Sequence, residues 1–180
     1  MKYIFDFDDV LFYTTKHRLE HMFILLEKSG IERSKIEEYY KEKRLSGFSL
    51  RDTLAYFFAG TEVDCEKLYD EIMGKSENFI NTELINVLKS LGKENCFLIT
   101  HGGDEFQNDK IRRAGVSQLF AEIIILIGSK KEAVESICEK YKNEKVVFVD
   151  DKAHYFQDLD FKKYPNLKTI LYTGQLLTNL

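Results

Sequence analysis

Three acidic residues stand where a buried β-strand is expected to end. Residues 2–7 are apolar and rich in β-forming side chains, and Asp6, Asp8 and Asp9 lie at or just beyond the end of this run. In an extended chain, Asp6 and Asp8 would project to the same side. Carboxylates this close repel by about 1 kcal/mol per pair at 4 Å in water and about 4 kcal/mol near a protein surface. A divalent cation with oxygen ligands would relieve that repulsion, whereas an acidic turn explains Asp9 but not Asp6.

Two later segments have the same form, an apolar run that ends in polar side chains. Residues 96–99 lead to Thr100, and residues 146–149 lead to Asp150 and Asp151. In an open parallel α/β sheet, ligands bind beyond the carboxyl ends of the strands. The first acid group, the Thr100 hydroxyl and the second acid pair are therefore expected to converge on one site.

The rest of the chain predicts the elements that would hold this site. Helical patterns alternate with the strand patterns after residue 78, and residues 168–174 resemble a last edge strand, which together favour a parallel α/β sheet. Residues 15–77 predict helix after helix with no strand. We therefore expect an α/β core formed by residues 1–14 and 78–180, with residues 15–77 inserted as a separate helical unit.

The order of these segments resembles the haloacid dehalogenase (HAD) superfamily of phosphohydrolases. The resemblance rests on DFDDVL, a threonine after a strand, a lysine that opens a helix, and VFVDD, which span nearly the whole chain. It implies a Rossmann-like parallel sheet and identifies the helical insert as a C1 cap that contributes to substrate selection. It also implies a Mg²⁺-dependent phosphatase that hydrolyses a small phosphomonoester through an aspartyl-phosphate.

The resemblance also implies roles for the matching residues. Asp6 would be the nucleophile, and Asp8 the general acid that protonates the leaving oxygen and later activates water. Members specialised as dehalogenases lack an acid at the second position, so Asp8 points to phosphate chemistry. Thr100 would donate its hydroxyl to a phosphate oxygen. His101 and Gly102 follow it, and the small residues here let backbone N–H groups approach the anion.

A lysine would supply the cation beside the transferred phosphoryl group. Lys130 and Lys131 both lie at an expected helix N-terminus, where the helix dipole disfavours a positive charge. A lysine at this position therefore suggests a functional reason. Lys130 is preferred, since Lys-x-x-Ala at the start of a helix resembles the family pattern. The proline that often follows this lysine in the family is missing here.

The same resemblance implies the ligands of a magnesium ion. Mg²⁺ would be held by the Asp6 carboxylate, the Asp8 backbone carbonyl and Asp151, with Asp150 acting directly or through water. A small carboxylate set of this kind suits an ion that keeps several waters. Many members have a further acid a few residues on, whereas residues 154–156 of this chain are not acidic.

Several other residues are open to two interpretations. His17 and His21 share a helix face and could bind a metal, but without a third ligand a surface or hinge position is favoured. Arg51 and residues 43–44 stand near the aromatic residues of 48–58. They could form a wall of the cap that meets the substrate, although aromatic residues at that spacing are more typical of the cap's own core.

Composition narrows the partners and the compartment. The chain has 180 residues, a formal net charge of −4 and interleaved charges, which gives no case for a nucleic-acid or anionic-membrane partner. No apolar run has the length of a membrane span, and the chain begins directly with a strand pattern rather than a secretory signal. The three widely spaced cysteines indicate reduced thiols. We therefore expect a cytoplasmic protein that acts on a small phosphorylated metabolite.

Two alternatives remain open at this stage. A phosphomutase on the same scaffold would return the phosphoryl group to a sugar phosphate instead of giving it to water, and product analysis would separate the two. A non-catalytic module that binds phosphate for regulation would keep the site without turnover. The intact Asp6 and Asp8 pair argues against this second alternative.

Overall fold

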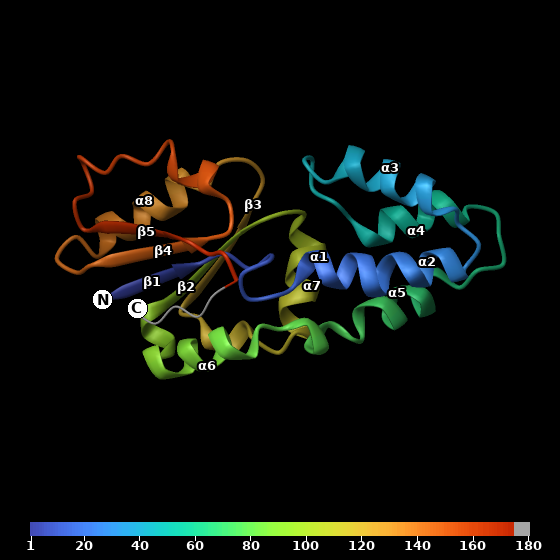
Figure 1. Ribbon diagram of the computed structural model, residues 1–180, viewed down its shortest axis with the longest axis horizontal. Helices are drawn as coiled ribbons and strands as arrows, with labels where there is room; N and C mark the ends of the chain where they lie inside the picture. Colours follow the sequence, from blue (N-terminus) through green and yellow to red (C-terminus); the bar gives the residue numbers. More distant parts are fainter. Residues whose placement is uncertain (175–180) are drawn as a thin grey trace.

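The computed structural model of the chain describes residues 1–174. Its five strands form one parallel sheet in the order β3-β2-β1-β4-β5 (Figure 1), which confirms the predicted α/β architecture and the edge position of the last strand. The strands are β1 (Lys2–Phe5), β2 (Cys96–His101), β3 (Glu122–Leu126), β4 (Val146–Asp150) and β5 (Leu167–Leu171).

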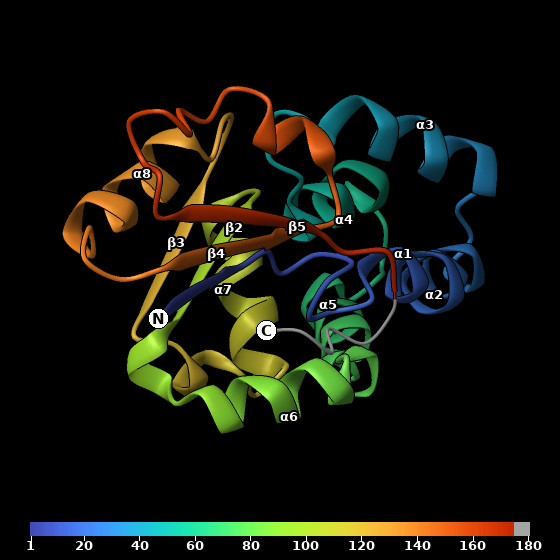
Figure 2. The same ribbon diagram turned by 60° about the vertical axis from the view of Figure 1, so that its left-hand side comes forward.

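Helices cover both faces of this sheet. One face packs against α6 (Thr82–Leu91) and α7 (Asp104–Arg113), and the other packs against α8 (Lys131–Lys140). Along β1, Phe5 belongs to the first hydrophobic core and Ile4 to the second. Figure 1 and Figure 2 show α6 and α8 on opposite sides of the strands. Burial on both faces explains why the central strands are continuous apolar runs rather than alternating ones.

A second group of helices lies beside the carboxyl ends of the strands (Figure 1). Its elements are α1 (Thr14–His17), a π-helical segment (Arg18–Met22), α2 (Phe23–Lys28), α3 (Arg33–Lys43), α4 (Leu50–Phe58) and α5 (Cys65–Met73). They enclose a hydrophobic cluster of their own, separate from the two clusters on the sheet. Its buried members include Met22, Phe23, Leu26, Ile36, Leu54 and Ile72. We refer to residues 14–73 as the helical layer.

Side-chain caps fix the starts of two helices in this layer. The Ser49 hydroxyl accepts a hydrogen bond from the Asp52 amide at the start of α4, and the Asp64 carboxylate accepts one from the Lys67 amide at the start of α5. These contacts satisfy amide groups that have no partner within the helix. Ser and Asp are among the preferred N-cap residues, so both helix starts are consistent with the local sequence. Short 3₁₀ turns cover Ser76–Phe79, Lys93–Asn95, Ser117–Leu119 and Ala153–Phe156.

Two sequence-based expectations about local structure are wrong. The first strand ends at Phe5 rather than at residue 7, because the Phe7 amide turns back to donate to Asp6 Oδ1 at 2.7 Å. Asp8 therefore lies in the turn that follows and not in an extended strand. A regular helical period predicts Leu19 on the buried face with Phe23 and Leu26, yet 39% of Leu19 is exposed. The π-helical segment has more residues per turn than an α-helix, which rotates Leu19 away from the core.

The helical layer is attached to α7 by polar contacts. The Tyr69 hydroxyl donates to Asp109 Oδ2 at 2.8 Å, and Arg113 Nη2 donates to Asp70 Oδ1 at 2.6 Å. Near the sheet, a Cβ atom placed on Gly103 would lie 3.2 Å from the Phe48 carbonyl oxygen. The loop between α3 and α4 therefore approaches the end of β2 closely, and glycine leaves room for that approach.

Two further expectations from composition can be compared with the structure. Cys65, Cys96 and Cys138 are all free thiols, as predicted. Among the helices within residues 1–174, none has the length and the apolar character needed to cross a membrane.

His17 lies at the junction between the helical layer and the sheet. Only 3% of it is exposed, so of the two favoured positions, surface and hinge, the surface position does not apply to this residue. Its ring packs edge-on against Phe12 and Phe79, and its Nε2 is 3.3 Å from the Ile72 carbonyl oxygen. His21 Nε2 approaches the same oxygen at 3.1 Å. Both imidazoles thus contact the C-terminal end of α5.

We expect the buried His17 to make the protein less stable in acid. Burial lowers the pKa of His17 from 6.5 to about 4. Between these two pH values, the unfolded chain therefore binds a proton that the folded protein does not bind. Above pH 6.5 this has no effect. As the pH falls from 6.5 to 4, the free energy of unfolding should drop by about 3 kcal/mol. Urea unfolding of His17→Gln should show a shallower loss over this range than the wild-type protein.

The control for this measurement is His154→Gln, which alters an exposed imidazole. It should keep the wild-type slope, because the side chain that it replaces is exposed rather than buried. Equal slopes for His17→Gln and the wild-type protein would contradict the assignment of this slope to His17.

Candidate active site

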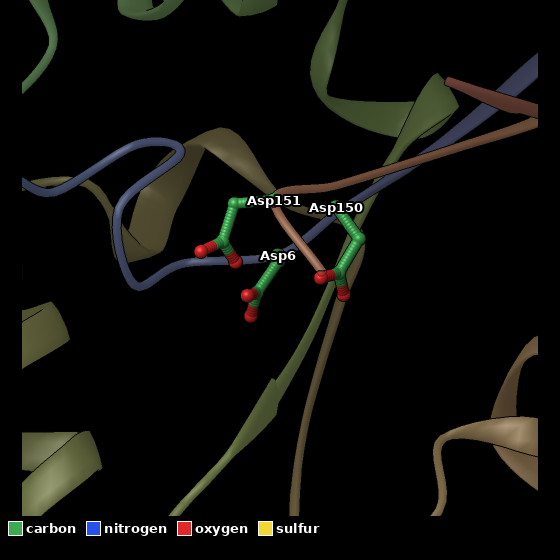
Figure 3. A group of neighbouring side chains, drawn as sticks. All are labelled: Asp6, Asp150 and Asp151. Carbon is green, nitrogen blue, oxygen red and sulfur yellow. The ribbon is translucent and has the colours of Figure 1, made fainter. Parts of the chain in front are cut away.

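The carboxyl ends of β1 and β4 bring three carboxylates together. The Asp6 amide donates to the Val149 carbonyl at 2.9 Å, which holds the residue after β1 beside the end of β4. Carboxylate oxygens of Asp6, Asp150 and Asp151 all lie within 4.8 Å of one another. Figure 3 shows the three side chains next to each other, from two strand ends that are far apart in sequence. The expected convergence of these two acid groups is thus present in the structure.

Lys130 lies between two of these carboxylates. It is completely buried, and its Nζ is 2.8 Å from Asp6 Oδ1 and 2.7 Å from Asp150 Oδ2. Burial alone would lower its pKa, but the two carboxylates outweigh burial and raise the pKa, so the amine stays charged. Lys131 points elsewhere, with its Nζ 2.5 Å from the Asp158 carbonyl oxygen. Of the two candidate lysines, the structure places only Lys130 in the site.

The two aspartates after β4 differ in what their oxygens contact. Asp150 is fully buried, with one oxygen on Lys130 and the other accepting from the Lys152 amide at 2.8 Å. Burial and the charge of Asp6 raise the pKa of Asp150. Asp151 is partly exposed, and only its Oδ1 contacts a cation, the Lys152 amine at 3.2 Å. Asp151 is therefore the better placed of the two to give an oxygen to a bound ligand.

Asp8 is held by residues that sequence reasoning missed. Lys110, from α7, is buried and forms an ion pair with Asp8 Oδ1, which also accepts a hydrogen bond from the Thr14 hydroxyl. Gln107 Nε2 donates to Asp8 Oδ2 at 2.6 Å. Burial would raise the pKa of Asp8, but Lys110 outweighs it and the pKa is lowered. The sequence did contain one signal for Lys110, because it is a lysine between the apolar Phe106 and Ile111 on a helix that follows Thr100.

Thr100 lies behind the wall of the site. It is fully buried, and its Oγ1 is 3.3 Å from Gln107 Nε2. His101 and Gly102 line the cavity directly. Gln107 also donates to the His101 carbonyl at 2.8 Å, so this one amide links the end of β2 to Asp8.

A cavity of about 470 Å³ opens above these groups. Asp6, Asp8 and Lys130 line it from the sheet side, and Arg18 and Phe48 line it from the helical layer. Its volume is within the range of small-molecule sites. The structure therefore encloses the acid groups and the buried lysine under a wall made by a different set of helices.

Arg51 does not reach this cavity. It pairs with Glu66, and its Nε is 3.0 Å from Glu105 Oε1. The suggested role of Arg51 in meeting a substrate is therefore not supported by its position. Arg44 and Phe48, from the same stretch, do line the cavity.

Comparison with known proteins gives one family and a shared fold. The model of the haloacid dehalogenase-like hydrolase family matches residues 3–154. No curated protein matches the chain.

Several solved structures have the same fold. A haloacid dehalogenase-like hydrolase from Burkholderia xenovorans LB400 superposes with a TM-score of 0.69 at 19% identity, over 93% of this chain and 81% of that one. A HAD family enzyme from Bacteroides thetaiotaomicron, solved as a magnesium complex, gives 0.62 at 17% identity over 99% and 94%. An L-2-haloacid dehalogenase from Xanthobacter autotrophicus gives 0.52 at 16% identity over 83% and 69%. At these identities the likeness shows the fold alone.

The buried pair of Lys110 and Asp8 yields a stability prediction. Replacing Lys110 with Met should leave the Asp8 carboxylate uncompensated and lower the free energy of unfolding by about 3 kcal/mol. In an Asp8→Asn background the same replacement should cost clearly less, since no buried charge is left behind. Urea unfolding at pH 7 in the presence of EDTA would measure all four proteins.

Lys131→Met is the matched control, because it removes a half-exposed lysine outside the cavity. Its effect should stay within about 0.5 kcal/mol. An equal cost for Lys110→Met with and without Asp8 would show that the two side chains are not coupled.

Proposed function

The chain belongs to the haloacid dehalogenase-like hydrolase family, and we propose that it is a Mg²⁺-dependent phosphatase acting on a small phosphomonoester through an aspartyl-phosphate. The main support is the position of the buried Lys130, whose amine contacts Asp6 while both residues line one cavity with Asp8. A carboxylate nucleophile, a second acid and a fixed cation are the groups that phosphoryl transfer requires. A dehalogenase would have no use for the acid at position 8.

In the first step, a carboxylate oxygen of Asp6 attacks phosphorus. The bond from phosphorus to the leaving oxygen breaks, and Asp8 gives that oxygen a proton, which the carboxylate takes up when the phosphate anion bound beside it offsets the charge of Lys110. Asp6 is oriented for this role because the Phe7 amide and Lys130 both hold its Oδ1. The product is an alcohol and an acyl phosphate on Asp6.

In the second step, water attacks the phosphorus atom of the acyl phosphate. The Asp8 carboxylate takes a proton from this water, and the bond between phosphorus and the Asp6 oxygen breaks. The ion pair with Lys110 and the hydrogen bond from Gln107 hold Asp8 as the carboxylate that this step needs. Inorganic phosphate leaves, Asp6 is restored, and Asp8 again carries a proton.

Fixed positive charge stabilises both transition states. The Lys130 amine is excluded from solvent, where an ionic contact to a phosphoryl oxygen is stronger than it would be in water. The backbone at His101 and Gly102 lines the same cavity and offers N–H groups to the anion. Thr100 lies behind this wall, and its hydroxyl would support the phosphate site through Gln107 rather than by direct contact.

The acid cluster has the chemistry of a magnesium site. Its three carboxylates lie within 4.8 Å of one another, and oxygen ligands are those that Mg²⁺ prefers. Asp6, Asp151 and the Asp8 carbonyl would bind the ion directly, while Asp150, whose oxygens already accept from Lys130 and Lys152, would act through water. Bound Mg²⁺ would add positive charge beside the transferring phosphoryl group.

We further propose that the helical layer acts as a cap. The cap would comprise residues 15–77, inserted into a core of residues 1–14 and 78–180. Support comes from its separate hydrophobic cluster and from the wall that it contributes to the cavity. The close approach of its loop to Gly103 would exclude bulk water from the site.

Loss of the nucleophile gives the direct test of this function. Asp6→Asn should reduce the release of phosphate from p-nitrophenyl phosphate with Mg²⁺ by about a thousandfold or more. Asp158→Asn, an exposed carboxylate outside the cavity, should stay within about twofold of the wild-type rate. One phosphate released per alcohol formed indicates transfer to water, whereas an isomeric phosphate without free phosphate indicates a mutase. Full activity in Asp6→Asn would reject the aspartyl-phosphate.

The proposed metal ligands give a second test. Asp151→Asn should raise the Mg²⁺ concentration needed for half-maximal activity by about tenfold or more, because it removes a directly bound oxygen. The same titration followed as Mg²⁺-dependent thermal stabilisation provides a readout that does not depend on turnover. Asp158→Asn again serves as the control. An unchanged Mg²⁺ requirement in Asp151→Asn would place the ion elsewhere.

A further inference from the structure

The cations that line the cavity are of two kinds. Its three lysines are all paired with carboxylates of the site, and no lysine charge is left over. The pairs are Lys110 with Asp8, Lys130 with Asp6 and Asp150, and Lys152 with Asp151. The cavity is also lined by Arg18 and Arg44, and within residues 1–174 neither guanidinium has a carboxylate partner. The positive charge available to a bound ligand therefore lies on the helical layer.

Arg18 is held in position by aromatic side chains. Its Nη1 donates to the Tyr40 hydroxyl at 2.8 Å, and its guanidinium carbon lies 4.5 Å from the centre of the Tyr40 ring. Tyr40 in turn packs against Phe48 and Phe23, at 5.1 Å and 5.9 Å between ring centres. A guanidinium has five N–H donors, and the Tyr40 hydroxyl accepts from only one of its nitrogens. The side chain is thus oriented in advance and keeps donors for a ligand.

Arg44 is on the same wall, just after α3, in the loop that approaches Gly103. The cavity is also lined by apolar side chains that include Met22, Phe48 and Phe106. The cavity therefore combines a phosphoryl-transfer end, apolar walls and a cationic wall on the helical layer.

We propose that Arg18 and Arg44 form a second anion-binding subsite, so that the substrate is a phosphomonoester with a second anionic group, a carboxylate or another phosphate. This inference rests on the proposed function, in which Lys130 and the acid cluster receive the transferred phosphate. The planar guanidinium binds both kinds of anion through paired N–H groups. Its charge is uncompensated in a partly enclosed cavity, where the attraction of an anion is stronger than in open solvent.

Matched pairs of substrates test the subsite. Alkyl phosphates of increasing chain length would be compared with the carboxyalkyl phosphate and the bisphosphate of the same length. At one chain length or more, the anionic member should have a kcat/KM about tenfold or more above that of the alkyl phosphate. Two ratios are compared, that of the carboxyalkyl phosphate to the alkyl phosphate and that of the bisphosphate to the alkyl phosphate. The larger of the two identifies the preferred second anion as carboxylate or phosphate. A ratio near one at every length would overturn the proposal.

Variants connect this preference to the arginine. Arg18→Gln should reduce the ratio of the two kcat/KM values by about tenfold, and Arg18→Lys should recover part of it. Arg33→Gln removes the same charge from the helical layer outside the cavity and should leave the ratio as it is. A ratio that is equally high in Arg18→Gln and in the wild-type protein would overturn the assignment to Arg18.

Binding without turnover separates this inference from the proposed function. Calorimetry would measure the affinity of the Asp6→Asn protein for each carboxyalkyl phosphate, with and without Arg18→Gln. About tenfold weaker binding in the double variant supports the subsite. Absence of phosphate release from every ester, including p-nitrophenyl phosphate, would reject the proposed function. Release of phosphate with no preference for anionic members would reject only the subsite.

Discussion

The site depends on the compensation of like charges that the fold forces together. Parallel strands must end at the same edge of the sheet, so β1 and β4 place Asp6, Asp150 and Asp151 within 4.8 Å of one another. Two lysines form ion pairs with these three carboxylates: Lys130 from the start of α8 and Lys152 from the loop after β4. Lys152 pairs with Asp151, whereas Asp6 and Asp150 share the single charge of Lys130, so one negative charge of the group is not neutralised. A divalent cation at the acid cluster would offset this remaining charge.

A second compensation, built on α7, holds the other acid of the site. Asp8 lies in a turn outside the strand, where local backbone geometry alone would not fix its side chain. Lys110 and Gln107 are one helical turn apart on α7, and together they contact both oxygens of Asp8. Gln107 also reaches the end of β2 through the His101 carbonyl. The two acids of the first segment are therefore oriented by different elements, Asp6 by α8 and Asp8 by α7, which lie on opposite faces of the sheet.

The features of the fold and the site that could be predicted from the sequence are those that depend on residues close together in the chain. Apolar runs and their terminal acids are local, so the parallel sheet and the meeting of Asp6 with Asp151 could be predicted. Helix caps such as Ser49 are local too. The partners Lys110 and Lys152 could not be found this way, because a lysine in a helix or loop shows its contact only once the packing is known. Leu19 failed for a related reason. The π-helical segment shifts the phase of the helix, so a regular period wrongly assigns Leu19 to the buried face.

The positive charges around the cavity are divided between the sheet and the helical layer. This division indicates where a chain of net charge −4 could bind an anion. Every lysine that lines the cavity is already paired with an internal carboxylate, so a bound metal would add to the positive charge that the sheet side offers a phosphate. The guanidinium groups of Arg18 and Arg44 are not used in this way. Their charge comes from the helical layer rather than from the strand end and the start of α8 that hold Asp6 and Lys130. If the proposed function and subsite hold, selectivity and chemistry would be carried by side chains with separate structural supports.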